Sequence, residues 1–285
     1  MQRHCAHDRC RSASVFGTTD NVRPAEALKR DGGEGIKTGE AARAVRAAPV
    51  VFGRPAYPPR MEFDPADLPV ALRYNLMIGT IVPRPIAVVG TASPNGRPNV
   101  APFSFFMGCG SNPMCLVVSV ANPPGGAGEK DTLRNAKPVE EGGTGVFTVS
   151  VATEDTLARI VACAEPLPYG ESEFDLAGLT PTWGTKVRAP RVRESPVSYE
   201  CRTRQLVRMA PGVEGASTLI IGEVVHVHLD DALAHERYHI DPAKLRAVGR
   251  MGGPDYCTTR ERAPLPYGRG ALAKPVAWTR DQPPA

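Results

Sequence analysis

The sequence predicts a mainly β fold, an antiparallel β-barrel of about six or more short strands with short flanking helices. The 285 residues include 29 proline and 28 glycine residues, a density that rules out a helical bundle and favours short elements joined by turns. At least six runs have the composition of strands, whereas few stretches show helical periodicity. The hydrophobic content of 42% is enough for a sizeable core, so wholesale disorder is excluded.

The six expected strands are bounded by turn-forming residues. The first two, over residues 86–92 and 99–106, flank the turn 93–96 and form a hairpin, because its glycine supplies a positive φ and its proline fixes its own. Pro102 cannot donate a hydrogen bond to a ladder, so the second strand is expected at a sheet edge or with a kink. The other four strands are expected over residues 115–120, 146–151, 197–209 and 219–229.

Two short helices are expected between the strands. The first covers residues 131–137 with Asp131 as its N-cap. The second covers residues 154–163, where Leu157, Ile160 and Val161 share one face at helical spacing. No element is predicted in the proline- and glycine-rich stretch from Pro166 to Pro196. The chain shows no internal repeat.

The basic excess of the chain belongs to its first 60 residues. The formal net charge is +4, and residues 1–60 hold 11 Lys and Arg against 6 Asp and Glu, while the rest hold 23 against 24. This segment lacks a sustained apolar period, so we expect a disordered basic extension, or translation that begins at Met61. Its cations are scattered and not interleaved with aromatic residues, so nucleic-acid binding is not predicted. Residues 61–285 are expected to form one domain.

Composition also bears on location. No apolar run approaches the ~18–20 residues that span a bilayer, and no secretory signal is visible. The 7 cysteines lack the regular spacing of a disulfide framework. The sequence therefore predicts a cytoplasmic protein without a membrane partner.

Four motifs follow one another between residues 83 and 135. They are Pro83-Arg84-Pro85-Ile86, Asn99-Val100-Ala101-Pro102-Phe103-Ser104-Phe105-Phe106, Ser111-Asn112-Pro113 and Lys130-Asp131-Thr132-Leu133-Arg134-Asn135. In this order and spacing the chain resembles the flavin reductase-like family of FMN-binding split-barrel proteins. Residues 174–180, 195–201 and 249–253 also resemble the family, so the similarity covers about residues 70–260. Met107 and Met114 depart from it, because the family often has Asn and a second Pro there.

The resemblance implies a split barrel that binds FMN and transfers hydride from NADH or NADPH to flavin. Such proteins are typically homodimers with FMN near the subunit interface, and some supply a separate monooxygenase. The candidate cofactor-binding residues are Arg84, Pro85, Thr91, Ala101, Pro102, Phe103, Ser104, Lys130, Asp131, Thr132, Asn135 and Arg250. No catalytic side chain is assigned, because hydride transfer is the chemistry of the cofactors themselves.

The residue types at the start of the first helix suit a phosphate. The ammonium of Lys130, the hydroxyl of Thr132 and the free N–H groups of a helix start can converge on a dianion, and Asn135 one turn later can reach the ribityl chain or the phosphate. The alternative is an ordinary capped helix exposed to solvent.

The kinked aromatic segment suits the flavin ring. Backbone groups near Ser104 are expected to face the ring, with Phe103, Phe105 and Phe106 partly in the core. Thr91 and Ser93 are further hydrogen-bonding candidates. Arg250 can neutralise a phosphate and Tyr256 can cover the ring, or the two form an ordinary loop pair.

Other motifs match known patterns only in part. Residues 125–132 resemble a P-loop, but Glu129 and Asp131 interrupt it and would repel phosphates. Residues 235–239 match HExxH, but Pro242 follows too soon for the helix that a zinc protease needs.

Two groups of potential metal ligands remain. His226 and His228 share one face of a strand, as either a metal pair or ordinary strand surface. His4, Cys5, His7 and Cys10 have ligand chemistry without a second arm of ligands. No metal site is predicted.

The sequence therefore predicts an FMN-dependent oxidoreductase that takes hydride from NADH or NADPH. The alternative is a split-barrel module that binds flavin without turnover.

Overall fold

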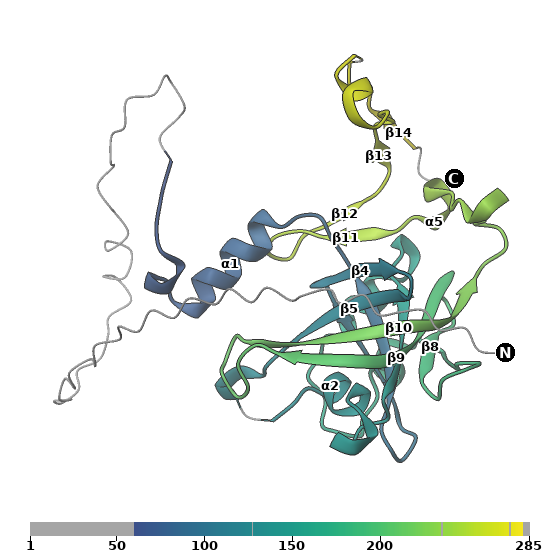
Figure 1. Cartoon of the computed structure of the whole chain (residues 1–285). Coiled ribbons are helices and arrows are strands. Elements are labelled where there is room, and N and C mark those ends of the chain that lie inside the picture. Colours follow the sequence, from purple (N-terminus) through teal and green to yellow (C-terminus); the bar gives the residue numbers. More distant parts are fainter. Residues whose placement is uncertain (1–59, 127, 235, 274, 282–285) are drawn as a thin grey trace, which may run out of the picture. The chain divides into compact units, whose positions relative to one another are not determined.

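The structure is a computed structural model that describes residues 60–126, 128–234, 236–273 and 275–281. The chain divides into two compact units, Met1–Phe63 and Asp64–Ala285. The expected basic extension lies outside the described residues except for Arg60. All the elements belong to the second unit (Figure 1).

A seven-stranded antiparallel sheet forms the body of this unit. Its strands, in spatial order, are β3 (Pro98–Phe103), β2 (Ala87–Ala92), β6 (Val146–Val151), β9 (Val197–Arg208), β10 (Ser217–Leu229), β5 (Met114–Ala121) and β4 (Phe106–Ser111). The two edge strands, β3 and β4, are consecutive in the chain, with only Ser104 and Phe105 between them. The sheet therefore curls into a barrel, and the ends of β3 and β4 meet at this link. The two strands are not hydrogen-bonded to each other, so the barrel is split between them.

Alternation of side chains along the strands produces two cores. In β5, Leu116, Val118 and Val120 are buried and their neighbours are less so, the period of two expected of a strand. All six residues of β2 are buried because both of its faces are covered. Val89 joins the core inside the barrel, while Val88 joins a second core outside it.

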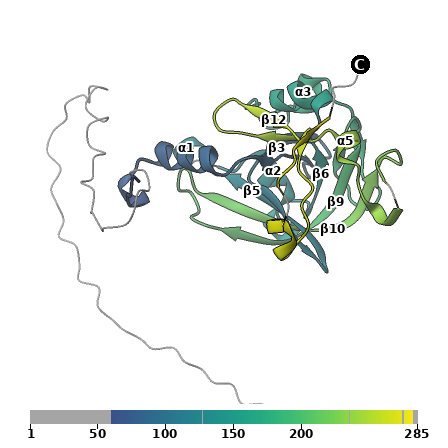
Figure 2. The same ribbon diagram turned by 90° about the horizontal axis from the view of Figure 1, so that it is seen from above.

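Short helices and smaller sheets surround the barrel (Figures 1 and 2). The helices are α1 (Val70–Thr80), α2 (Asp131–Ala136), α3 (Leu157–Ala162), α4 (Glu173–Ala177) and α5 (Pro242–Leu245). Helix α2 packs Leu133 and Ala136 into the inner core of the barrel. The smaller sheets join β1 (Arg84–Pro85), β11 (Val248–Arg250) and β12 (Tyr256–Thr258), then β7 (Pro181–Trp183) and β8 (Pro190–Val192), then β13 (Glu261–Arg262) and β14 (Thr279–Arg280). The 3-10 helices are η1 (Pro65–Asp67), η2 (Pro124–Gly126), η3 (Val139–Glu141), η4 (Glu154–Thr156), η5 (Glu236–Tyr238) and η6 (Gly268–Ala273).

Most expected strands are confirmed, and β6 has the predicted bounds. Because β3 is an edge strand, the prediction from Pro102 is also confirmed. The single strand expected over residues 99–106 is wrong: it ends at Phe103, and a separate strand β4 begins at Phe106.

The expected helices need three corrections. Asp131 is not the N-cap of α2 but its first helical residue, and Lys130 is the N-cap. The expected helix over residues 154–163 is divided into η4 and α3. On α3, Ile160 is buried, whereas Val161 is 38% exposed and does not share its face.

Several elements were not predicted. They include α1, α4, the β7–β8 hairpin and the strands β11 to β14. Within the predicted HExxH segment, η5 is a single short turn, and His235 lies outside the described residues. None of the helices in the described ranges is long and apolar enough to cross a membrane.

Candidate functional site

Three of the expected site residues meet in a buried polar cluster under α2. Thr91 comes from β2, while Thr132 and Asn135 come from α2, and all three are at most 2% exposed. Asn135 Nδ2 donates to Thr91 Oγ1 at 3.2 Å. Asn99 of β3 completes the cluster, because its Nδ2 lies 3.2 Å from Thr91 Oγ1 and 3.5 Å from Thr132 Oγ1.

One acceptor of this cluster has no partner among the described residues. Asn135 Oδ1 is buried and accepts no hydrogen bond. Buried polar atoms are normally paired, so this oxygen is a candidate acceptor for a water molecule or a ligand hydroxyl.

The start of α2 does not form the cradle that the sequence suggests. The side chain of Lys130 is exposed, whereas the Thr132 hydroxyl points into the buried cluster. The ammonium and the hydroxyl therefore do not converge on one point. Asp131 pairs with Arg134 at 3.0 Å, and the Arg134 guanidinium lies over the ring of Tyr169 at 4.3 Å. Burial raises the pKa of Asp131, while the charge of Arg134 opposes this shift.

The outer edge of β3 offers backbone groups beside this cluster. Val100 donates its N–H to Glu173 Oε2 at 3.1 Å, so its backbone faces away from β2. The backbone N–H and C=O groups of successive strand residues point to opposite edges of the strand. The carbonyl of Pro102, two residues after Val100, therefore points to the same outer edge. Ala101 is half-buried against the barrel core, and Phe103 lies within it. Burial raises the pKa of Glu173.

Arg84 holds together the link between the two edges. Its guanidinium donates to Ser104 Oγ at 3.2 Å, to the carbonyls of Ile78 and Ile81 at the end of α1, and to the carbonyl of Met251 at 2.9 Å. Only 4% of Arg84 is exposed, so the chain itself uses most of its donors. The neighbouring Pro85 is exposed.

Arg250 and Tyr256 form a pair on neighbouring strands. The Arg250 guanidinium lies over the Tyr256 ring at 4.5 Å, hydrogen-bonds the Tyr256 hydroxyl, and donates to the Gly253 carbonyl at 2.8 Å. In β1 and β11, Arg250 is the register partner of Arg84.

Two features of this region were missed by sequence reasoning. Asn99 belongs to the second motif but was not among the candidate site residues, and its position opposite Thr91 in the β2–β3 ladder shows its place in the cluster. A cleft of about 680 Å³ also opens nearby, where Arg97 donates to the Gly170 carbonyl at 2.6 Å. None of the expected site residues lines it; its lining is Arg97, Pro98, Leu167, Gly170, Glu171, Ser172, Asp175 and Leu176.

Comparison with known proteins identifies the family. The model of the family described as "Flavin reductase like domain" matches residues 78–246 of this chain. This range includes all the expected site residues except Arg250. The chain belongs to the flavin reductase-like family. This confirms the resemblance seen in the sequence.

Proteins with similar sequences and folds come from several organisms. An uncharacterized protein of Aquifex aeolicus is 34% identical over 196 residues, which are 69% of this chain and 94% of that protein. The crystal structure of nitrilotriacetate monooxygenase component B from Bacillus cereus is 32% identical, with a TM-score of 0.67 over 73% of this chain and 100% of that one.

A further solved structure shows the fold alone. A split-barrel protein of Shewanella frigidimarina NCIMB 400 is 24% identical, with a TM-score of 0.62 over 73% of this chain and 100% of that one. The predicted fold class, an antiparallel split barrel with few short helices, is confirmed.

Proposed function

We propose that this member of the flavin reductase-like family is an FMN-dependent oxidoreductase that transfers hydride from NADH or NADPH to flavin. The family supports a flavin as cofactor and flavin reduction as the type of reaction. A relative that is 32% identical is component B of a monooxygenase, which supports a role in supplying reduced flavin to a separate enzyme.

The observation that carries this proposal is the open edge of the barrel. Here the outer backbone of β3, the hydroxyl of Ser104 and the polar cluster under α2 come from neighbouring elements. A flavin has a flat apolar ring with polar edges and a polyhydroxyl chain. An edge strand with outward carbonyls beside a set of hydroxyl and amide groups has matching chemistry.

Different candidate residues would bind the ring, the ribityl chain and the phosphate of FMN. The Pro102 carbonyl and Ser104 would bind the polar edge of the ring, with Ala101 and Phe103 behind it. Asn135 would accept from a ribityl hydroxyl. Lys130, exposed at the start of α2, would neutralise the phosphate.

Arg84 would act on the site through another residue. Because its Nε donates to Ser104 Oγ, it fixes the direction in which that hydroxyl presents its own proton. Bound FMN supplies a ring that accepts hydride, and the chain has to orient it and exclude water.

The test is spectroscopic. The purified full-length chain, titrated with FMN and separately with FAD, should quench flavin fluorescence at micromolar concentrations. Anaerobic addition of NADH or NADPH should then bleach the flavin absorption. No binding of either flavin contradicts the proposal. Tight binding without reduction by either nicotinamide would favour the alternative, a flavin-binding module without turnover.

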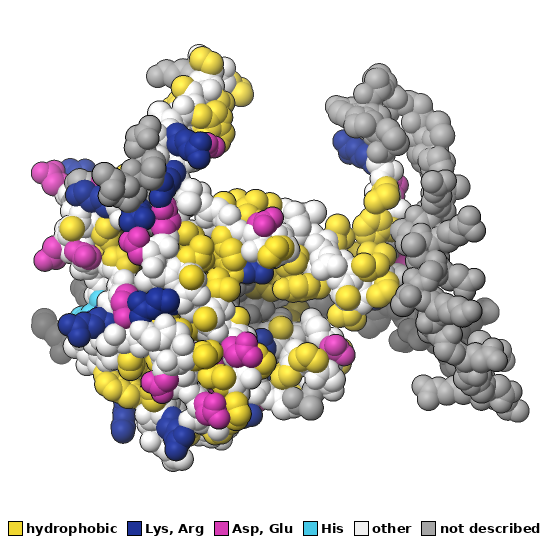
Figure 3. All heavy atoms as spheres, turned by 180° about the vertical axis from the view of Figure 1, so that it is seen from behind, with side chains coloured by type: hydrophobic (Ala, Val, Ile, Leu, Met, Phe, Trp, Pro, Cys, Tyr) yellow, Lys and Arg dark blue, Asp and Glu magenta, His cyan; other side chains and the backbone are white. Residues whose placement is uncertain are grey.

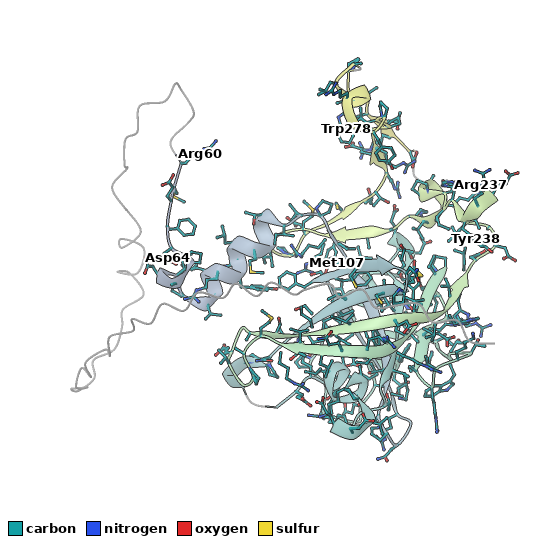
Figure 4. All side chains as sticks on the ribbon, viewed as in Figure 1. Arg60, Asp64, Met107, Arg237, Tyr238 and Trp278 are labelled. Carbon is teal, nitrogen blue, oxygen red and sulfur yellow. The ribbon has the colours of Figure 1, made fainter. Side chains whose placement is uncertain are left out.

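The proposed assembly is a homodimer in the cytoplasm, where both nicotinamides are available. The surface that we propose as its interface, here called the α1–β4 surface, consists of α1, residues 81–82 and β4 with the following turn to Met114. Its exposed hydrophobic residues are Val70, Leu72, Tyr74, Leu76, Met77, Ile81, Val82, Met107 and Met114. Figure 3 shows hydrophobic side chains gathered over α1, and Figure 4 labels Met107 on β4.

A further inference from the structure

Two histidines and a glutamate meet on the outer face of β9 and β10. His226 and His228 lie two residues apart on β10 and so point to the same side of the sheet. Glu200 is the register partner of His226 on β9. Each of the three offers a ligand atom, and these atoms all lie within 4.8 Å of one another. The two imidazole rings stand edge to face with their centroids 4.9 Å apart.

The carboxylate is held rigidly from behind. Glu200 is fully buried and accepts backbone N–H groups of the turn between β7 and β8. Thr185 donates to Oε1 at 2.6 Å, while Lys186 and Val187 donate to Oε2 at 2.6 and 2.9 Å. Three backbone donors therefore fix the orientation of the carboxylate.

Glu200 and His228 are hydrogen-bonded to each other through the two atoms that would bind a metal ion. His228 Nε2 lies 2.6 Å from Glu200 Oε1, so one proton occupies the space between them. An ion that bound both atoms at ordinary bond lengths would hold them about 3.3 Å apart, which requires only a small opening. Oε1 keeps its bond from Thr185, and such hydrogen bonds to a ligating carboxylate are typical of metal sites.

The fourth side of the cluster is accessible. The His228 side chain is 23% exposed, and His226 is also partly exposed. A water molecule can therefore complete a tetrahedral site, and the metal can enter without unfolding the sheet.

We propose that Glu200, His226 and His228 bind one divalent first-row transition ion, with Zn²⁺ as the representative. Two imidazoles and one carboxylate suit such an ion, whereas Mg²⁺ and Ca²⁺ prefer oxygen ligands alone. The ion joins β9 and β10 to the β7–β8 turn. The site shares no residue with the candidate flavin site, so it goes beyond the proposed function. The sequence shows only the histidine pair, and the structure adds the carboxylate.

The experiment compares metal binding by the wild-type chain and its variants. Full-length protein, freed of metal with a chelator, is titrated with Zn²⁺ by competition against a chromophoric chelator. Residues 4–10 also carry potential ligands, so the difference between variants, and not the stoichiometry, decides. We expect His226→Ala and His228→Ala each to weaken the tightest site at least tenfold. The matched control is His239→Ala, which removes an exposed histidine outside the cluster and should leave that site unchanged.

Cobalt gives a second readout that does not depend on affinity. Co²⁺ bound at this site should show the visible absorption of a tetrahedral nitrogen and oxygen site, without a thiolate charge-transfer band, and this signal should vanish in the double variant. Unchanged flavin binding and circular dichroism would show that the variants are folded. If the wild type and the double variant bind Zn²⁺ equally, the proposal is overturned and the Glu200–His228 contact only anchors the β7–β8 turn.

Discussion

At the scale of single residues, two lysines at the ends of α2 differ in how they are held. Lys130, the N-cap, is exposed. Lys137, the C-cap, places its ammonium 2.7 Å from Glu129 Oε2. One of the two cations is thus already neutralised by a carboxylate, which makes the pair a matched test for a phosphate contact.

The first prediction concerns the phosphate of FMN. Lys130→Ala should weaken FMN binding by about 1.5–3 kcal/mol, or 10- to 150-fold, because a charge-assisted bond is lost. Riboflavin, which lacks the phosphate, should bind both proteins equally. Lys137→Ala should leave FMN affinity unchanged. Fluorescence titration measures all three, and equal FMN affinity of wild type and Lys130→Ala would remove this residue from the site.

At the scale of elements, the β7–β8 hairpin packs directly on the barrel at a glycine. A Cβ added to Gly90 of β2 would lie 1.9 Å from the Pro190 carbonyl oxygen and 2.6 Å from Thr148 Oγ1. Thr148 itself donates to that carbonyl at 2.6 Å. The absence of a side chain at Gly90 is therefore what lets the hairpin approach the sheet.

The second prediction follows from this close approach. Gly90→Ala should lower the free energy of unfolding by about 1–3 kcal/mol, because backbone atoms must move to admit the methyl group. Gly108→Ala is the control, since its Cβ would meet nothing within 4 Å. Urea denaturation compares the two. If Gly90→Ala and the control had the same free energy of unfolding, the hairpin would be able to move away from the methyl group without loss of stability.

The carboxylate of Glu154 in η4 forms ion pairs with two arginines that follow α5 in the chain. Glu154 pairs with Arg260, whose Nε lies 2.9 Å from Oε1, and with Arg246 at 3.2 Å. The hydrogen bond from Arg260 is the largest cause that lowers the pKa of Glu154; burial opposes it, and Arg246 lowers the pKa further. A carboxyl group whose pKa is lowered by folding stabilises the folded state above its ordinary pKa of about 4.3 and loses this effect as the pH falls.

The third prediction is therefore a pH-dependent effect. Glu154→Gln should lower the urea midpoint at pH 7, and the difference from wild type should shrink as the pH falls below about 4, where the wild-type carboxyl group begins to take up its proton. Glu140→Gln, at an exposed position of η3, should show no such difference. A difference that stays constant down to low pH would indicate lost packing and not lost charge.

At the scale of the whole molecule, α1 is hydrophobic on nearly all sides, yet none of its residues is buried. Helices of this kind are normally covered. Within the described chain, Tyr74 meets Phe105 at 6.4 Å between ring centroids, and Val70 lies beside the turn between β9 and β10. Most of the α1–β4 surface is exposed, and a second copy is its proposed occupant.

The fourth prediction tests this interface. Wild type should be a dimer by sedimentation equilibrium, and Leu72→Glu should shift it toward monomer because a charge would be buried between the copies. Val139→Glu places the same charge on an exposed apolar residue of η3 and should leave the dimer intact. A monomeric wild type would contradict the proposed assembly.

The parts of the fold that the sequence predicted correctly are those with local signals. β6 alternates in type between clear turns, so its bounds follow from its own residues. In contrast, α1 was missed because its N-cap, Pro69, provides no side-chain cap that would mark the helix start. β4 was missed because it contains Gly108 and Gly110 and is mostly exposed, so no alternation marks it.

The site residues divide in the same way. The motif over residues 130–135 led to Thr132 and Asn135, and Thr91 was a candidate because it stands at the end of the strand before the turn. Asn99 faces Thr91 in the predicted hairpin, but its contact with Thr132 depends on how α2 packs against that hairpin. The place of Glu200 beside His226 depends on which distant strands pair, and neither segment alone carries a signal for it. The N-cap of α2 was misplaced by one residue, since Asp131 uses its carboxylate for Arg134 and not for the helix start.

Arg84 donates at once to the end of α1, to the link between the barrel edges and to the segment after β11. One guanidinium thus connects the proposed contact between subunits with the proposed place of the cofactor. If association of the subunits fixes the conformation of this side chain, flavin should bind more tightly to the associated form. Thermodynamic linkage then requires that flavin binding favour association by the same factor.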